Sequence, residues 1–162
     1  MNNAIYSFRE PKNEPILSYS PGSLERELLK QELDLQNSKV IDIPLIIGGK
    51  EIRTGKTGKV VKPTDHGHVL ATYHMATEKE VALAIESALA AKDEWMTLAW
   101  MERAAIMIKA AELISKKYRY VINAATMLGQ GKNVIQAEID AACETIDYLR
   151  FNAYFASIVY GE

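Results

Sequence analysis

The sequence predicts a helix-rich chain in which short β-hairpin strands precede three to four long helices. A Gly48-Gly49 pair lies between two runs of β-branched residues, which is typical of a hairpin. From residue 77 onward, apolar residues recur every three to four positions, and capping signals mark the ends of these periodic stretches. With 162 residues, the chain is long enough for one domain with a hydrophobic core.

Residues 1–40 are expected to form an irregular arm and a short helix. Pro11 and Pro15 stand among polar residues, which favours an arm without regular structure. After a turn at residues 18–22, leucines at helical spacing predict a helix that ends near Leu35. These leucines are Leu24, Leu28, Leu29 and Leu33.

Strands are expected near residues 43–47, 50–53, 59–62 and 69–74. The Gly-Gly pair would form the two-residue turn between the first two. Residues 54–58 would supply the next turn, and Gly67 would separate the last two strands.

From Thr77 onward the chain is expected to be helical. Thr77 and Glu80 fit a capping box, and Thr97 would cap a second helix. A bend is expected around residues 116–120, and a further helix would stop at residues 129–131, where glycine adopts the left-handed turn. The residues expected to face inward are Val81, Ile85, Ala88, Leu89 and Trp95, followed by Met101, Ala104, Ala105, Ile108 and Ala111.

The last helix is expected to run from about Asn133 to Tyr160, which is roughly 40 Å at 1.5 Å per residue. Its apolar stripe comprises Ile135, Ile139, Ala142, Ile146, Leu149 and Ala153. Such a wide stripe needs more partner surface than the preceding helices offer. We therefore expect further chain to pack against it.

Composition and charge argue against several classes of function. The net charge of -2 leaves no basic excess to attract nucleic acid, and no apolar run is long enough to span a membrane. The first 14 residues lack the apolar core of a secretory signal and have too few arginines for a mitochondrial transit peptide. Because the single cysteine cannot form an internal disulfide, we expect a reducing, cytoplasmic setting.

No catalytic, metal or nucleotide-binding arrangement can be assembled from the residues. Cys143 lies in mid-helix beside acidic side chains, which raise the pKa of a thiol, so a buried structural role is favoured. His66 and His68 flank Gly67, and a simple turn is favoured over a metal site. The glycine pairs match neither the P-loop nor the dinucleotide-binding fingerprint.

Two glutamates of the last helix are candidates for a site. Glu138 and Glu144 are six residues apart and cannot share one helical face. Glu144 lies close to the apolar stripe, where a carboxylate either pairs with a cation, such as Arg150, or lines a cavity. The residues alone favour pairing or exposure to solvent over a role in a site.

Several segments resemble the aldehyde dehydrogenase family. Residues 46–51 resemble its opening hairpin, and residues 77–95 with the helix after them resemble its first two long helices. The stretch 129–142, with Asp147 and residues 150–153, is similar to the 1-pyrroline-5-carboxylate dehydrogenase subfamily. The segments Asn13-Glu14-Pro15-Ile16-Leu17 and Asp65-His66-Gly67-His68 are similar to it as well.

This resemblance implies an α/β parent enzyme with a dinucleotide-binding domain, a catalytic domain and an oligomerisation flap. Residues 41–162 would be the first, incomplete part of the NAD-binding domain. The parent would use NAD to oxidise L-glutamate γ-semialdehyde to glutamate in proline degradation. By the same resemblance Glu144 would face the aldehyde pocket, and Glu138 and Tyr148 would be weaker candidates for substrate contact.

The resemblance also places the catalytic cysteine, the water-activating glutamate and the nucleotide-binding segment outside this chain. We therefore expect the 162 residues alone to bind no NAD or metal, to be inactive and not to form the family homo-oligomer. Their partner would be the remainder of the enzyme chain. Two alternatives stay open: a related semialdehyde dehydrogenase, and a helical domain that binds a partner chain through an exposed apolar face.

Overall fold

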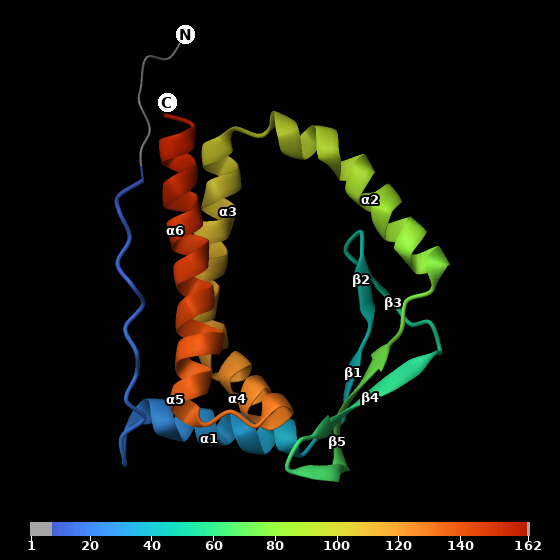
Figure 1. The fold of residues 1–162 in the computed structure, drawn as a ribbon, viewed down its shortest axis with the longest axis vertical. Coiled ribbons are helices and arrows are strands. Elements are labelled where there is room, and N and C mark those ends of the chain that lie inside the picture. Colours follow the sequence, from blue (N-terminus) through green and yellow to red (C-terminus); the bar gives the residue numbers. More distant parts are fainter. Residues whose placement is uncertain (1–7, 162) are drawn as a thin grey trace.

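The computed structural model describes residues 8–161, and it is rich in helix with a few short strands. Two long helices, α3 (Trp100–Leu113) and α6 (Glu144–Val159), lie side by side (Figure 1). Helices α1 (Leu24–Asn37) and α4 (Arg119–Gln130) pack together at one end of this pair (Figure 1). The strands lie to the other side of α4, and α2 (Glu78–Thr97) runs along the outer edge beyond them (Figure 1). The irregular arm before α1 follows the length of α6 (Figure 1).

The strands form two small sheets rather than one. In the first sheet β5 is central, parallel to β1 and antiparallel to β4, and the second sheet is the hairpin of β2 and β3. The bounds are β1 (Ile41–Ile43), β2 (Leu45–Ile47), β3 (Lys50–Ile52), β4 (Thr57–Lys62) and β5 (Asp65–His74).

The predicted hairpin turn is confirmed, but the strand expected over residues 43–47 is divided. Ile47 pairs with Lys50, and the two glycines between them have φ of 57° and 73°, which glycine adopts without steric cost. Pro44 separates β1 from β2, because proline has no amide hydrogen to continue a ladder. Gly67 lies within β5 instead of in a turn.

The helices begin and end close to the predicted positions, with one exception. Glu80 accepts a hydrogen bond from the Thr77 amide at 2.9 Å, as the predicted capping box requires. Thr97 does not cap the next helix, because it is the last residue of α2 and its hydroxyl donates to the Glu94 carbonyl at 2.8 Å. The bounds are α1 (Leu24–Asn37), α2 (Glu78–Thr97), α3 (Trp100–Leu113) and α4 (Arg119–Gln130).

The last helix is continuous, but part of it has π geometry. Asn133 caps it, with Oδ1 accepting from the Gln136 amide at 3.0 Å. The expected bend near residues 116–120 also coincides with a π segment, and such segments often mark functional sites. The bounds are η1 (Ile114–Tyr118), α5 (Val134–Gln136), η2 (Ala137–Cys143) and α6 (Glu144–Val159).

The core is divided into two small clusters. One contains Tyr19, Leu29 and Ala124, and brings the arm and α1 against α4. The other contains Ala111, Ala142 and Ile146, and joins α3 to the last helix. Each cluster is extended by partly buried neighbours, among them Leu17, Leu33 and Met127 for the first and Ile114, Ile122 and Leu149 for the second.

The face of α2 expected to point inward is not packed. No residue of α2 is buried, and Val81, Ile85 and Leu89 are each more than half exposed. In α3 the prediction holds for Ala104 and Ala111, whereas Ala105 is exposed. Burial of an apolar stripe depends on a partner surface, and among residues 8–161 only β2 makes more than slight contact with α2.

No helix within residues 8–161 combines the length and the apolar character needed to cross a bilayer.

Candidate functional site

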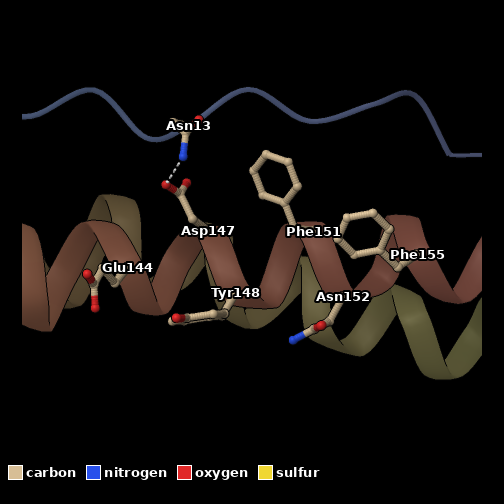
Figure 2. A pocket seen from close by; sticks show the side chains of 7 residues that line it. All are labelled: Asn13, Glu144, Asp147, Tyr148, Phe151, Asn152 and Phe155. Atoms are coloured by element: carbon tan, nitrogen blue, oxygen red, sulfur yellow. Dashed lines mark hydrogen bonds between the residues drawn. The ribbon is translucent and has the colours of Figure 1, made fainter.

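A hollow of about 520 Å³ lies along α6, between that helix and the arm. Two rows of side chains line it because residues four apart are neighbours on a helix. One row is Glu144, Tyr148 and Asn152, and the other is Asp147, Phe151 and Phe155. Asn13 reaches the hollow from the arm, and Figure 2 shows it opposite Asp147.

The hollow combines polar groups with an aromatic surface. Tyr148 is 65% exposed and Phe155 is 53% exposed, and Glu144 is exposed as well. A carboxylate, a phenol and an amide can exchange hydrogen bonds with a small polar molecule, while the phenyl rings offer apolar contact. Arg150, one possible cation partner for Glu144, pairs with Glu14.

Both carboxylate oxygens of Asp147 accept hydrogen bonds from the arm. Asn13 Nδ2 donates to Oδ2 at 2.8 Å, and the Glu14 amide donates to Oδ1 at 2.7 Å (Figure 2 shows the first of these). These bonds join residues more than 130 positions apart in the chain. The arm is therefore one wall of the hollow, attached directly to α6.

A buried ion cluster fastens the arm to η2, to the start of α4 and to α6. Arg119, which follows η1, is 4% exposed and pairs with Glu138 of η2 and with Glu14 of the arm. Arg150 of α6 also pairs with Glu14. Breaking one partner out of such a buried cluster leaves an uncompensated charge, which is strongly destabilising.

Glu138 accepts hydrogen bonds from three groups besides Arg119, two in the arm and one in α4. The Leu17 amide, the Tyr19 hydroxyl and Asn123 Nδ2 donate to it at 2.8, 2.7 and 2.8 Å. Its side chain has no exposure to solvent. The structure therefore places Glu138 in the ion cluster and not on the wall of the hollow, which favours a structural role over direct contact with a substrate.

The pKa values of both cluster carboxyls are lowered. Burial by itself would raise the pKa of Glu138, but hydrogen bonds from Arg119, Leu17, Tyr19 and Asn123 outweigh it. Burial likewise opposes ionisation of Glu14, and hydrogen bonds from Ser115, Arg150 and Arg119 lower its pKa. Both groups are therefore carboxylates at neutral pH.

Cys143 behaves as the buried residue that the sequence predicts. It is 5% exposed and lies in the ion cluster, with Sγ 3.8 Å from Glu138 Oε1. Burial, and next the Glu138 carboxylate, raise the pKa of this thiol to about 11. The thiolate is therefore scarce at neutral pH, so Cys143 is a poor nucleophile.

The part of the chain that the structure describes has no cradle that fits a nucleotide phosphate. Helix α2 follows β5, which is the order that a phosphate loop requires. Its first turn, however, carries Glu78 and Glu80, and Glu80 already accepts the Thr77 amide. Within residues 8–161 we also find no group of three or more His, Cys, Asp and Glu side chains that could hold a metal.

The family resemblance singled out two residues of one row, Glu144 and Tyr148. It did not indicate the hydrogen bonds that Asp147 accepts from Asn13 and the Glu14 amide, which we call the clasp. Glu144 and Tyr148 lie together on the wall, as their spacing of four residues allows. The partners Asn13 and Asp147 could not be paired from sequence, because nothing in a local pattern indicates a contact across 134 positions. The resemblance at residues 13–17 was the only signal that the arm mattered.

A comparison with protein-family models matches residues 51–162 to the aldehyde dehydrogenase family. The chain belongs to the aldehyde dehydrogenase family. The match includes α6 and all of the hollow except Asn13. The helix-rich arrangement with a few strands is thus part of an aldehyde dehydrogenase fold.

Individual aldehyde dehydrogenases extend the likeness to the arm. The chain is 49% identical over 150 residues to the mitochondrial Delta-1-pyrroline-5-carboxylate dehydrogenase of Dictyostelium discoideum, covering 93% of this chain and 27% of that protein. It is 50% identical over 150 residues to a probable Delta-1-pyrroline-5-carboxylate dehydrogenase of Schizosaccharomyces pombe, covering 92% and 27%.

A solved structure of the same kind shares the fold. It is the Delta-pyrroline-5-carboxylate dehydrogenase from Mycobacterium tuberculosis bound with NAD, with 44% identity and a TM-score of 0.94. The alignment covers 98% of this chain and 30% of that one. The chain therefore spans about three tenths or less of the length of the aldehyde dehydrogenases it matches.

Proposed function

We propose that this chain is the amino-terminal part of an NAD-dependent dehydrogenase that oxidises L-glutamate γ-semialdehyde, the open form of 1-pyrroline-5-carboxylate, to glutamate in proline degradation. The supporting observation is the identity of 49–50% over nine tenths of the chain to proteins that carry this name. The likeness includes Asn13 of the arm and the α6 residues that line the hollow.

Glu144 and Tyr148 are our candidates for contact with the substrate. The open semialdehyde carries an ammonium group, and an exposed carboxylate on the wall of a hollow is a suitable partner for it. Tyr148 stands one helical turn further along and presents its hydroxyl to the same space. Glu138 was expected as a third contact, and its position in the ion cluster supports a structural role in its place.

Residues 41–162 would form the first part of the NAD-binding domain, with residues 1–40 as the arm and short helix. The exposed apolar surface supports packing against further chain. The large exposed apolar side chains include Val81, Leu83, Ile85, Leu89 and Met96 of α2, and Phe155, Ile158 and Val159 of α6. Large exposed apolar patches often mark a contact with another protein surface.

The catalytic groups and the NAD site would come from chain outside these residues. NAD is bound in the related structure from Mycobacterium tuberculosis, and when bound it accepts the hydride that leaves the substrate carbon. In this chain the first turn of α2 is acidic and Cys143 is protonated, so neither supplies these parts.

The cytoplasmic location stays a prediction. The relative from Dictyostelium discoideum is named mitochondrial, whereas the name of the one from Schizosaccharomyces pombe gives no compartment. Cell fractionation with an antibody to this chain would decide between the two compartments.

The test compares NAD reduction by the 162-residue chain with that by a protein extended through the downstream coding sequence. We expect glutamate semialdehyde to be oxidised only by the extended protein. Activity of the 162-residue chain alone would contradict the proposal. A preference of the extended protein for another semialdehyde would favour the related dehydrogenase.

A matched substitution tests the role of Glu144 in the extended protein. Glu144→Gln keeps the shape of the side chain and removes its charge. We expect a higher KM for glutamate semialdehyde and little change for propanal, which has no ammonium group. An equal rise for both aldehydes would point to a change of the wall itself and would contradict the proposed ion pair.

A second candidate function is supported by the exposed face of α2, no residue of which is buried. A helical interaction domain would use this face to bind a partner chain. It predicts that neither protein reduces NAD and that the 162-residue chain self-associates or captures a partner as its concentration rises. Sedimentation of the chain over a range of concentrations, beside the activity assay, separates the two functions.

A further inference from the structure

The clasp between the arm and α6 stands apart from the residues that face the hollow. Asp147 lies between Glu144 and Tyr148 in sequence, but both of its oxygens are occupied by the arm, at 2.8 Å from Asn13 Nδ2 and 2.7 Å from the Glu14 amide. A carboxylate used in this way is a fixed support rather than a free ligand. Hydrogen bonds to an ionised acceptor are among the stronger ones in proteins.

The arm is fixed again just beyond the clasp. The Glu14 carboxylate accepts from Ser115 Oγ at 2.7 Å and pairs with Arg119 and Arg150. Three residues later, the Leu17 amide donates to Glu138 at 2.8 Å. An extended segment without its own backbone ladder is ordered only by such contacts, since they offset its loss of conformational entropy.

The two attachments have different consequences for the hollow. The side-chain contacts of Glu14 and the amide of Leu17 lead to the buried ion cluster, whose residues do not line the hollow. The contacts of Asp147 lead to Asn13, which lines the hollow itself. The second attachment joins the arm to the hollow directly, because Asn13 and Asp147 line it together with Glu144 and Tyr148. Arg150 of α6 also holds the arm, through Glu14, but does not line the hollow.

We propose that Asp147 is a positioning residue for the substrate: by clasping Asn13 and the Glu14 amide, it holds the arm as a wall of the hollow and sets the width of the space beside Glu144 and Tyr148. This inference rests on the proposed function, since it assumes that the hollow receives the aldehyde. The arm then acts on substrate affinity through its position and not through contact with the substrate.

The clasp can be broken and restored by exchanging its two side chains in the extended protein. Asn13→Asp places two carboxylates against each other and breaks the contact by repulsion. Asp147→Asn alone is expected to be mild, because the Asn13 amide can turn and accept from the new amide group. The double variant, Asn13→Asp with Asp147→Asn, restores a donor opposite an acceptor.

Two measurements read the outcome in each variant. Steady-state kinetics gives KM and kcat for glutamate semialdehyde and for propanal, and hydrogen exchange gives the protection of the Glu14 and Leu17 amides. We expect Asn13→Asp to raise KM for both aldehydes by about tenfold, with a smaller effect on kcat, and to deprotect Glu14. The double variant should recover both KM and protection.

Each of the other outcomes has a defined meaning. Loss of protection without a change in KM would overturn the inference, because the clasp would then serve stability alone. Recovery of protection without recovery of KM, or an effect confined to the charged semialdehyde, would show that Asn13 touches the substrate, which also overturns it. If the wild-type extended protein oxidises neither aldehyde, the proposed function itself has failed. This result is obtained before any variant is measured.

Discussion

Replacing Glu138 with glutamine, which has the same side-chain shape, should destabilise the fold strongly. The side chain has no exposure to solvent and accepts from the Leu17 amide, the Tyr19 hydroxyl and Asn123 Nδ2, besides pairing with Arg119. Glutamine keeps one acceptor oxygen and sets an amide donor against groups that already donate. The charge of Arg119 also loses its main buried partner.

The expected cost is about 3 kcal/mol, at the lower end of the range for breaking a buried ion pair by removal of one partner. It is at the lower end because Glu14 continues to pair with Arg119. For a chain of this size, that cost lowers the melting temperature by about 6–12 °C. Urea denaturation of the 162-residue chain, followed by circular dichroism, measures the change in the free energy of unfolding.

Glu144→Gln is the matched control, since it makes the same chemical change on the same long helix at an exposed position. Its free energy of unfolding should stay within about 0.5 kcal/mol of the wild type. If the two variants unfold at the same urea concentration with the same slope, the ion cluster does not stabilise the fold and the reasoning is wrong.

Three further predictions concern the same chain. Folding lowers the pKa values of Glu14 and Glu138, so the stability that these carboxylates contribute is present above the unfolded pKa of 4.5 and is lost as pH falls through the folded pKa values. Urea midpoints measured from neutral pH downward should therefore fall once the pH drops below 4.5. A midpoint that does not change with pH would contradict this prediction. Cys143 should resist iodoacetamide in the folded chain and react in urea, because its thiol is buried and has a pKa of about 11; fast labelling of the folded chain would show an open thiol. Gly131→Ala should destabilise the fold by about 1 kcal/mol, because φ at this residue is +70°. Gly129→Ala lies inside α4 with open space around it and should stabilise the fold by about 0.5 kcal/mol. Urea midpoints of the two variants that shift in the same direction would contradict this prediction.

Elements fixed by short-range chemistry were predicted well. The two-glycine turn, the Glu80 cap and the helix end at Gly131 depend on residues within a few positions of one another. The stop at Gly131 follows from the left-handed conformation, which glycine adopts without the steric cost of a β-carbon. Glu144 and Tyr148 lie on one side of α6 because they are one helical turn apart, and their role in a site stays a prediction.

Errors occurred where a local pattern had more than one use. Thr97 has the side chain of a helix cap, but its hydroxyl bonds back to the Glu94 carbonyl within α2. The apolar face of α2 has the periodicity of a buried helix, yet its residues are exposed because the pattern does not supply the partner. Arg150 was only one possible partner of Glu144, and its pairing with Glu14 is a longer-range contact that packing brings about.

The sequence by itself determined the helices, the hairpin, the resemblance to aldehyde dehydrogenases and the residue types available for a site. Only the tertiary structure decided that the arm lies along α6, that Glu138 is enclosed in an ion cluster and that Asp147 holds Asn13. Backbone propensity and capping act over one or two helical turns, so they can be read from neighbouring residues. Contacts between residues more than 100 positions apart, such as Glu14 with Arg119, depend on how all the elements pack, and no local pattern carries that information.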